Sequence, residues 1–315
     1  MRRLNVAVVG CGFWGRNHAR IYNDLESASL VAVADVNERA ARALSERYGA
    51  DSYLDSQDVF ERMDVEAVSI CTPTVTHAEI ALAAIEAGKH VLVEKPMTDT
   101  VEEAERVVRA AEGAGVHLMV GFVERFNPGV IEAIRRVSKG EIGEVILARA
   151  HRVSRYPLRI SDVGVVKDLS IHDVDIVRHL FASEPESIYA TAGSIVHSFE
   201  DYANIIIRFR ENRSAFIESN WLTPRKIRRL ILTGSEGLIT VEFITQEITV
   251  EDNERQFKPF LQTREPLTLE LEDFVGSVLS DTPPKVSGDD GLQALRICEA
   301  ALKSAELGKP VRIAD

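Results

Sequence analysis

The chain has 315 residues, 45% of them hydrophobic, which is enough to bury two cores of ordinary domain size. Lysine and arginine total 37 against 49 acidic residues, and the formal net charge of −12 argues against a protein that coats nucleic acid or an anionic membrane. No apolar stretch of the sequence reaches membrane-spanning length. Cys11, Cys71 and Cys298 are widely spaced and show no metal-type pairing. We therefore expect a cytoplasmic protein with reduced thiols and small-molecule partners.

Short apolar runs alternate with helical patterns through the first 120 residues. Strands are expected at 4–10, 30–36, 67–73, 90–96 and 116–122. Helices are expected at 76–87 and 100–111, the second opened by a capping box of Thr100 and Glu103. This alternation predicts an α/β fold with an N-terminal, doubly wound parallel sheet of the Rossmann type.

The first turn of this region, GCGFWG, carries glycines at positions 10, 12 and 15 directly after a strand. Three glycines could simply make a tight turn. Here Asp35 ends the second strand twenty positions after Gly15, where a carboxylate that binds a nucleotide ribose belongs. The pattern therefore predicts dinucleotide binding. Because Asp35 would repel an added phosphate, NAD is expected in preference to NADP.

A second signal is VLVEKPMT at 91–98, an apolar run that stops at Glu94, Lys95 and Pro96. Proline cannot donate a hydrogen bond to a sheet, so the strand must end here and Lys95 must lie at its carboxyl end. Ligands bind at this edge of open parallel sheets. A lysine that merely caps a strand in solvent would leave Glu94 and Pro96 unexplained.

With the glycine turn, the stretch CTPTVTHAEIALAAIEAGKHVLVEKPM at 71–97 resembles the glucose-fructose oxidoreductase, inositol dehydrogenase and MocA (Gfo/Idh/MocA) family, and the resemblance spans nearly the whole chain. It implies that Lys95 lies beside the nicotinamide and stabilises negative charge on the reacting oxygen. Physics alone would allow His77 to be an ordinary helix-start residue. The predicted cofactor contacts are Gly10, Gly12, Phe13, Trp14, Gly15, Asp35, Thr72, Pro73, His77, Glu94 and Lys95.

After Phe122 the pattern changes to longer alternating runs, typical of a largely antiparallel sheet. These runs lie at 144–153, 204–210, 228–234 and 238–244, and an amphipathic closing helix is expected at 290–309. We predict an NAD-binding domain at 1–122 and, at 123–315, an α+β substrate-binding and oligomerisation domain with a large open sheet. The closing helix could pack back on the first domain. The resemblance implies a homodimer or homotetramer formed through the sheet.

The stretch KDLSIHDVDIVRHL holds Asp168, His172, Asp175 and His179 at helical spacings of four, three and four. For Asp173 and His179 an ordinary solvated helix face is expected. The resemblance implies that His172 accepts the proton of the substrate hydroxyl, while Asp168 orients it or shares that work. A metal site of Asp168, His172 and Asp175 is conceivable from the ligand types. Hydride transfer to NAD needs only a base and an oxyanion partner, so no metal is predicted.

Nine basic and four acidic residues lie between Arg125 and Lys167, a local excess of five positive charges. The segment from GFVERFNP at 121–128 through RISDVGVVKDLSIHDVDIVRHL at 159–180 resembles a branch of the family formed by UDP-N-acetylglucosamine 3-dehydrogenases, and arginine forks suit a diphosphate. The predicted substrate contacts are Arg125, Asn127, Arg152 and Arg155, with Arg159 in the same cluster. A second basic run, RKIRRL at 225–230, could add to this site or belong to a strand or subunit interface.

These observations predict an NAD-dependent oxidoreductase that oxidises a secondary hydroxyl of a sugar to a ketone, such as C3 of UDP-N-acetylglucosamine. One alternative is a free sugar or inositol dehydrogenase of the same family. Another is a non-catalytic NAD-binding sensor, which the glycine turn and Asp35 alone would permit. The presence of Lys95, Asp168 and His172 together disfavours the sensor.

Overall fold

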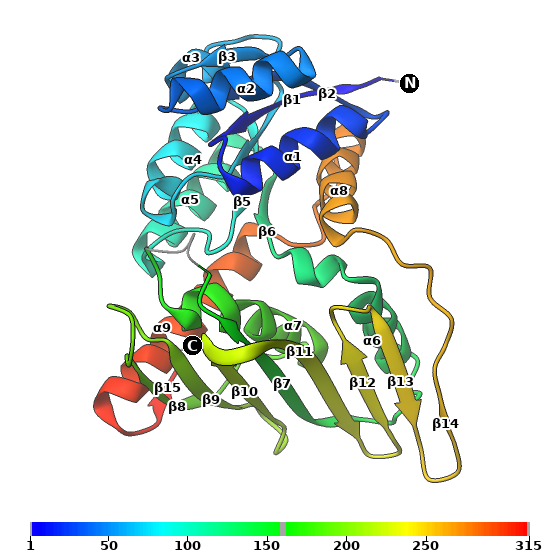
Figure 1. The fold of residues 1–315 in the computed structure, drawn as a ribbon. Helices are drawn as coiled ribbons and strands as arrows, with labels where there is room; N and C mark the ends of the chain where they lie inside the picture. The colour runs from blue at the N-terminus through cyan, green and yellow to red at the C-terminus, as the bar shows by residue number, and fades with distance from the viewer. Residues whose placement is uncertain (1, 158–161, 314–315) are drawn as a thin grey trace. The chain divides into compact units, whose positions relative to one another are not determined.

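The computed structural model describes residues 2–157 and 162–313 and divides the chain into two compact units. The first unit comprises residues 1–122 and 267–292, and the second comprises 123–266 and 293–315 (Figure 1). The first unit thus includes a segment far beyond residue 122 in sequence. Arg159 of the predicted basic cluster lies outside the described residues.

The first unit is built on a six-stranded sheet in the order β3-β2-β1-β4-β5-β6. Its strands are β1 Leu4–Val9, β2 Ala28–Ala34, β3 Asp51–Tyr53, β4 Ala67–Ile70, β5 His90–Glu94 and β6 Leu118–Gly121. All five pairings are parallel, which confirms the predicted sheet. The strand order reverses between β1 and β4. In open α/β sheets this switch point is where ligands bind, at the carboxyl ends of the strands.

Helices lie against this sheet, and their ends follow from local sequence (Figure 1). They are α1 Phe13–Asp24, α2 Glu38–Tyr48, α3 Ser56–Phe60, α4 His77–Glu86, α5 Val101–Ala114 and α8 Pro266–Ser280. The predicted capping box is present, because Thr100 accepts from the Glu103 amide while the Glu103 carboxylate accepts from the Thr100 amide. Gly115 ends α5 with a left-handed backbone, φ +66°.

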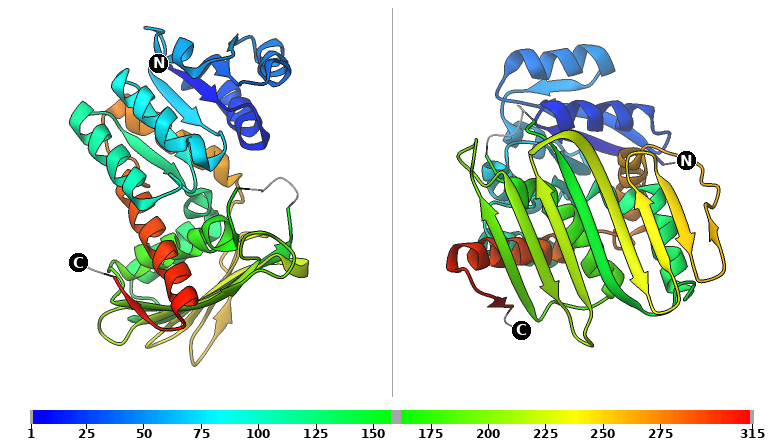
Figure 2. Two further views of the ribbon diagram at one scale, coloured as in Figure 1. Left: turned by 90° about the vertical axis from the view of Figure 1, so that its left-hand side faces the viewer. Right: turned by 60° about the horizontal axis from the view of Figure 1, so that its bottom comes forward.

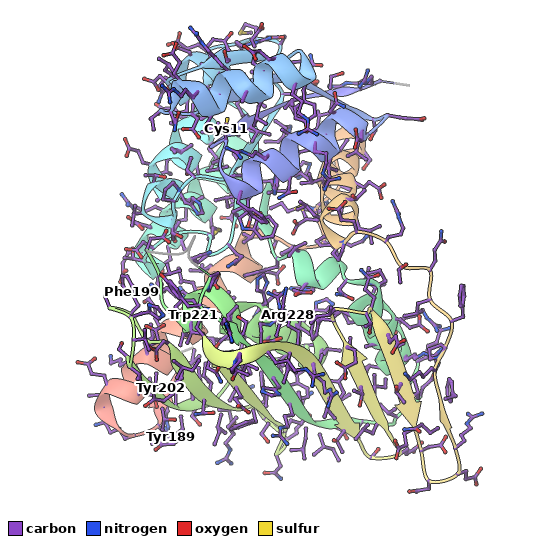
Figure 3. All side chains as sticks on the ribbon, viewed as in Figure 1. Cys11, Tyr189, Phe199, Tyr202, Trp221 and Arg228 are labelled. Atoms are coloured by element: carbon purple, nitrogen blue, oxygen red, sulfur yellow. The ribbon has the colours of Figure 1, made fainter. Side chains whose placement is uncertain are left out.

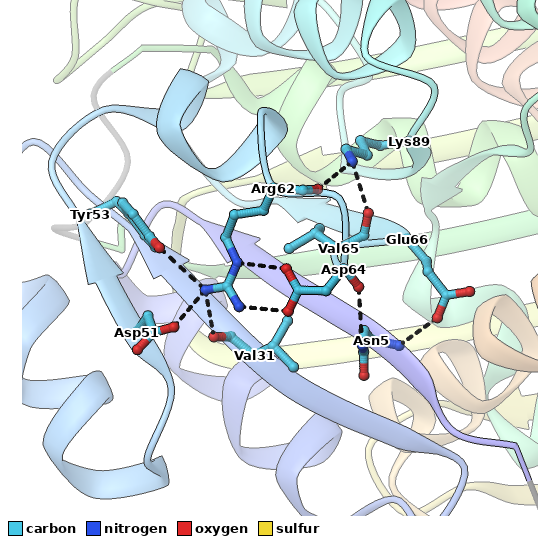
Figure 4. A network of polar contacts seen from close by, with 9 residues as sticks. All are labelled: Asn5, Val31, Asp51, Tyr53, Arg62, Asp64, Val65, Glu66 and Lys89. Atoms are coloured by element: carbon cyan, nitrogen blue, oxygen red, sulfur yellow. Dashed lines mark hydrogen bonds and ion pairs between the residues drawn. The ribbon is translucent and has the colours of Figure 1, made fainter.

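A polar network joins loops at the amino ends of the strands, opposite the ligand edge (Figure 4). Arg62 donates to both oxygens of Asp64, at 2.9 and 2.7 Å, and to Asp51 at 2.7 Å. The buried Lys89 donates to the carbonyl oxygens of Arg62 and Val65, at 2.7 and 2.9 Å. Burial lowers the pKa of Lys89 from its ordinary value. These bonds tie β3 to the loops before β4 and β5, so we interpret the network as structural.

The second unit is built on a nine-stranded sheet in the order β14-β13-β12-β11-β7-β10-β9-β8-β15. Its strands are β7 Val145–Arg155, β8 Ser187–Gly193, β9 Tyr202–Arg208, β10 Ser214–Asn220, β11 Leu222–Gly234, β12 Leu238–Glu242, β13 Glu247–Glu251, β14 Gln256–Phe257 and β15 Val311–Arg312. Among the described pairings of this nine-stranded sheet, only β7 with β10 is parallel. The predicted, mostly antiparallel sheet is therefore confirmed.

Helices α6 Pro128–Ser138, α7 Ile171–Phe181 and the later part of α9 Gly288–Leu307 cover one face of this sheet (Figure 2). The opposite face exposes apolar side chains, because Ile205 and Ile207 of β9 are buried while Ile206 between them is 45% exposed. The register aligns Ile206 with Tyr189 of β8 and Phe216 of β10 in one row. This open face matches the expectation of a large open sheet.

Strand β11 begins at Leu222, six residues before the apolar run expected at 228–234. Its pairing with β7 is irregular between Leu222 and Ile227, where the sequence TPRK interrupts the alternation. Proline cannot complete the ladder, so the chain bulges before regular pairing resumes. Arg225 and Lys226 are exposed in this bulge.

Candidate active site

The glycine turn between β1 and α1 requires glycine at two of its three positions. Gly10 has φ +92°, and a Cβ added there would lie 2.7 Å from the carbonyl carbon of Cys71. A Cβ added at Gly15 would lie 1.7 Å from the carbonyl oxygen of Gly10. At Gly12, the N-cap of α1, an added Cβ would meet nothing within 4 Å. The turn is therefore tightly packed on one side and open before the helix amino end, as a bound pyrophosphate requires.

Asp35 follows β2 and reaches across to this turn. Its Oδ2 accepts a hydrogen bond from the Cys11 amide at 2.6 Å, and its Oδ1 accepts from the Asn37 amide at 2.8 Å. A carboxylate oxygen has two lone pairs, so each oxygen of this half-buried side chain can also accept a bond from a ribose hydroxyl. Burial, together with the negative charge of Asp35, raises the pKa of the Cys11 thiol to about 12. The turn and Asp35 thus fit an NAD molecule.

Glu94 is the last residue of β5, and Lys95 and Pro96 follow it at the same edge of the sheet, so Lys95 lies at the carboxyl end of the strand as predicted. Glu94 is buried, and its Oε2 accepts from the backbone amide of Lys95 at 3.3 Å. Its Oε1 lies 3.0 Å from Nε2 of His18 on α1. Both carboxylate oxygens therefore have protein partners, which favours a role in holding the backbone at Lys95. The Lys95–Pro96 peptide bond is cis.

His77 opens α4 and bridges two strand ends. Its Nδ1 lies 2.9 Å from the carbonyl oxygen of Pro96, and its Nε2 lies 2.8 Å from that of Thr72. The Thr72 hydroxyl accepts from Thr76 at 2.8 Å, and Pro73 is exposed beside it. His77 thus joins the loop after β4 to the loop after β5. That it also lines the cofactor stays a prediction.

A buried acid in the first unit was not expected from the sequence. Glu270 on α8 is 0% exposed, and neither carboxylate oxygen has a hydrogen-bond partner among the described residues. Burial first, and then the negative charges of Glu94 and Asp273, raise its pKa well above the ordinary value. An acidic residue on an amphipathic helix normally indicates an exposed position, so the sequence around Glu270 gave no indication that this residue is buried.

In the second unit, Asp168 and His172 lie on consecutive turns of one helical segment. Asp168 belongs to a π-helical turn, Val166–Ser170, that leads directly into α7. Such turns occur frequently at functional sites. Both side chains are buried, at 4% and 8% exposure. The spacing of four residues therefore places the predicted acid and base on neighbouring turns.

The structure contradicts one prediction about α7, the solvent exposure of Asp173. Asp173 is not on a solvated face: it is 1% exposed and accepts two bonds from Arg152, at 2.7 and 2.8 Å. His179 is exposed, as expected. Asp175 accepts from Arg125 at 2.8 and 2.6 Å, so both of its oxygens are engaged and the three-residue metal site is disfavoured. The described residues contain no group of three metal-ligating side chains in a suitable arrangement.

The predicted substrate contacts are largely engaged with protein groups. Arg125 and Arg152 each form a two-bond fork with a buried aspartate, an arrangement that favours a structural role over phosphate binding. Asn127 caps α6 through the Gly129 amide and donates to the Phe243 carbonyl at 3.0 Å. Arg155, at the end of β7, is exposed. Two of the nine basic residues counted in the sequence, Arg125 and Arg152, are therefore occupied by protein carboxylates.

Glu124 joins this cluster to an arginine that the sequence analysis did not single out. Its Oε1 accepts from Arg152 at 2.8 Å and from Arg228 of β11 at 2.9 Å. Burial acts to raise the pKa of Glu124, but the two arginine charges and the hydrogen bonds from Arg152 and Asn127 hold it below the ordinary value. Arg228 lies within the second basic run. Because Leu230, two positions later in the strand, is buried, the alternation of the strand indicates that Arg228 lies on the same, covered face.

The six-stranded parallel sheet, the glycine turn and the carboxylate of Asp35 after β2 are the features of an NAD-binding domain of the Rossmann type. A model of the oxidoreductase family with an NAD-binding Rossmann fold, Gfo/Idh/MocA, matches residues 4–122, and a model of the Gfo/Idh/MocA C-terminal domain matches residues 130–240. The chain belongs to this family. Among residues 2–157 and 162–313, no helix is both long and apolar enough to span a bilayer.

Relatives with different substrates match almost the full chain. The myo-inositol 2-dehydrogenase of Thermotoga maritima is 30% identical over 99% of each chain. The UDP-N-acetylglucosamine 3-dehydrogenase of Acidithiobacillus ferrooxidans is 29% identical over 96% of each. A solved structure of that second enzyme aligns with a TM-score of 0.91 over 98% of this chain and 99% of its own, at 26% identity. A putative myo-inositol dehydrogenase from Sinorhizobium meliloti aligns with a TM-score of 0.87 over 99% and 100%, at 28% identity.

Proposed function

We propose that this NAD-dependent sugar or polyol dehydrogenase oxidises a secondary ring hydroxyl of a nucleotide-linked amino sugar, such as C3 of UDP-N-acetylglucosamine, to a ketone. The observation that supports the proposal is the similarity to UDP-N-acetylglucosamine 3-dehydrogenase, which is 29% identical and whose two structures align with TM-scores of 0.91 and 0.88, close to the 0.87 of the inositol dehydrogenase structure. Nearly all of both chains is covered in each comparison.

In this proposal two side chains act on the reacting hydroxyl and a third orients one of them. NAD, when bound, accepts the hydride from the carbon that carries the hydroxyl. Lys95 donates a hydrogen bond to the reacting oxygen and stabilises its negative charge. His172 accepts the hydroxyl proton, and Asp168 orients His172. The products are a ketone, NADH and one proton. The support is the match to the family's strand-end and helix-start motifs, together with the burial of Asp168 and His172.

A free polyol or sugar is the second candidate substrate. Two observations favour it: 30% identity with an inositol dehydrogenase over 99% of each chain, and the pairing of Arg125 and Arg152 with buried carboxylates. A neutral substrate would need no excess of positive charge. This candidate uses Lys95 and His172 in the same roles, so only substrate comparison separates the two.

NADH production from a matched set of substrates tests the proposal. UDP-N-acetylglucosamine, free N-acetylglucosamine and myo-inositol would each be incubated with NAD and either wild type or the Lys95→Ala variant, and a mock purification without the enzyme is the control for contaminating activity. The proposal expects the highest kcat/KM for the nucleotide sugar, because remote binding energy can position the reacting hydroxyl. A higher kcat/KM for myo-inositol would establish the second candidate. Equal activity of the Lys95→Ala variant would remove Lys95 from the chemistry.

The open face of the nine-stranded sheet supports a homodimer or homotetramer. The row of Tyr189, Ile206 and Phe216 presents apolar side chains, and Arg149 lies 5.9 Å from the ring centroid of Phe216. Exposed apolar patches of this kind mark interaction surfaces. An Ile206→Asp variant should shift the light-scattering mass towards the monomer, whereas an unchanged mass would place the interface elsewhere. The cytoplasmic location stays a prediction.

A further inference from the structure

A row of polar side chains crosses the covered face of the nine-stranded sheet near the end of β7. The register places Ser219 of β10 opposite Arg152 of β7, and Arg152 opposite Arg228 of β11. Two arginines directly opposite each other repel, and such pairs destabilise a sheet unless acids intervene. Here Glu124 accepts from both arginines, while Asp173 accepts from the remaining edge of Arg152. The two arginines are not equally neutralised.

The guanidinium group of Arg152 is occupied by carboxylates on all sides, whereas that of Arg228 retains unused donors. The Arg152 side chain is 1% exposed and donates three bonds to two carboxylates. The Arg228 side chain is 30% exposed and donates one, from Nη1 to Glu124. A guanidinium has five N–H donors, so Arg228 keeps capacity through Nε and Nη2. Burial and the charge of Arg152 lower the pKa of Arg228, while Glu124, Asp173 and Asp168 oppose this.

Two further donors at the same end of the sheet are unsatisfied. The Ser219 hydroxyl and the Trp221 indole nitrogen are buried and have no hydrogen-bond partner among the described residues. Trp221 follows β10 and packs edge-on against Tyr156, with ring centroids 5.2 Å apart (Figure 3 labels Trp221 and Arg228). Strand β7 lies between β10 and β11, so donors on these two strands are about 9–10 Å apart, and only an extended ligand such as a nucleoside diphosphate could contact both. Buried donors without acceptors are costly, and a ligand rich in acceptor oxygens would satisfy them.

We propose that Arg228, together with Ser219 and Trp221, binds the phosphate oxygens of the substrate. Arg228 is then a residue that determines substrate specificity. This inference rests on the proposed nucleotide-sugar substrate. The quartet of Arg152, Arg228, Glu124 and Asp173 carries no net charge, so recognition comes from the directed donors of Arg228. The exposed Arg155 and Arg225, together with Lys226 in the β11 bulge, add positive charge at the rim.

The row of polar side chains is also connected to the helix that carries the proposed base, His172. Asp173, which accepts two hydrogen bonds from Arg152, directly follows His172 in α7. A phosphate bound at Arg228 would therefore lie on the same side of the second unit as the proposed base. Phosphate oxygens accept hydrogen bonds, which matches the unused donors of Arg228 and the indole N–H of Trp221.

Calorimetric titration of UDP into the NAD-loaded enzyme tests the inference separately from turnover. Arg228→Gln should weaken UDP binding about 10-fold to 100-fold, the range expected for loss of charge-assisted hydrogen bonds. The matched control is Arg229→Gln, because Arg229 is the next residue, is exposed and pairs with Glu242. It should bind UDP within twofold of wild type. Titrations with N-acetylglucosamine 1-phosphate and free N-acetylglucosamine show whether the phosphate itself is recognised.

The outcomes separate this inference from the proposed function. If wild type oxidises UDP-N-acetylglucosamine but Arg228→Gln binds UDP as tightly as wild type, the inference is overturned and the function stands. If wild type binds no UDP and oxidises only free sugar, both fail. If Arg228→Gln does not fold, Arg228→Lys and Ser219→Ala replace it. At least one of these must weaken UDP binding about 10-fold with unchanged far-ultraviolet circular dichroism, and undiminished binding in both would overturn the inference.

Discussion

Nε2 of His18 lies 3.0 Å from Oε1 of Glu94, with both side chains buried in the first unit. His18 belongs to the helix that starts at the nucleotide turn, and Glu94 immediately precedes Lys95. The other oxygen of Glu94 accepts from the Lys95 amide at 3.3 Å. The cofactor turn and the backbone of the proposed catalytic lysine are thus joined through one carboxylate.

The charge of Glu94 also affects Glu270, which leads to a prediction about stability and pH. Because burial and Glu94 raise the pKa of Glu270 in the folded state, the fold binds its proton more tightly than the unfolded chain does. Stability from this group is fully present below the ordinary carboxyl pKa and is lost as pH rises towards the folded pKa. Glu270→Gln should remove this loss and raise the unfolding free energy, by about 1–3 kcal/mol at neutral to alkaline pH.

Urea unfolding of wild type and Glu270→Gln, measured from about pH 5 to about pH 9, checks this linkage. The stability difference should grow with pH. Glu79→Gln, on the exposed side of α4, is the control and should track wild type at every pH. A Glu270→Gln variant with the same pH dependence as wild type would show that Glu270 is not held protonated.

Asp35 should determine the choice between NAD and NADP. Asp35→Ala removes the ribose acceptor and the Cys11 amide bond, so NAD should bind more weakly and the gap to NADP should narrow. Asp35→Asn keeps one acceptor oxygen but removes the charge, and should relieve the repulsion of about 1–4 kcal/mol towards the NADP phosphate. Fluorescence titration of both cofactors against the three proteins measures this. Tighter binding of NADP than NAD by wild type would contradict the role of Asp35.

The glycine turn offers a matched pair of substitutions. Gly15→Ala would place a methyl group against the Gly10 carbonyl, so the turn must move and NAD affinity should fall by at least about tenfold. Gly12→Ala meets open space in the protein and should leave thermal stability nearly unchanged, while it obstructs the approach of a pyrophosphate. Melting curves recorded with and without NAD separate the two effects. Gly12→Ala with normal NAD affinity would place the pyrophosphate elsewhere.

Arg152 should act on stability more than on substrate specificity. Arg152→Ala leaves Asp173 buried without its partner and Glu124 with Arg228 as its remaining cation, which should cost about 3–5 kcal/mol of unfolding free energy. Arg155→Ala, at an exposed position on the same strand, should change stability by less than about 0.5 kcal/mol. Urea unfolding of both variants tests the contrast. An Arg152→Ala variant of wild-type stability that loses UDP binding would restore the phosphate contact expected from the sequence.

The sequence predicted features that depend on local chemistry. The capping box at Thr100, the glycine turn and the end of β5 before Pro96 are set by residues within a few positions of one another, and the structure contains all three. The sequence predicted that β11 begins later than it does. The strand pairs with β7 both before and after the TPRK bulge, and a pattern of alternating residues cannot show a strand whose pairing is interrupted.

Long-range ion pairs could not be predicted in the same way. Arg152 and Asp173 are 21 residues apart, and Arg228 and Glu124 are 104 apart. A count of charges between 125 and 167 indicated an anion site, because the neutralising acids Asp173 and Asp175 lie outside that window. Only the fold shows which arginines retain unused donors. The same holds for Glu270, whose burial depends on how α8 packs.

Single-turnover hydride transfer tests the central claim most directly, that Lys95 and His172 act on the hydroxyl of a sugar oxidised by NAD. Wild type, Lys95→Ala and His172→Ala would be mixed with saturating NAD and the best sugar substrate, and NADH formation would be followed by stopped flow. His179→Ala, at an exposed position later in α7, is the control. We expect hydride transfer to slow about 100-fold to 10,000-fold in the first two variants, with NAD affinity within a few-fold of wild type. A His172→Ala enzyme with undiminished hydride transfer would contradict the account.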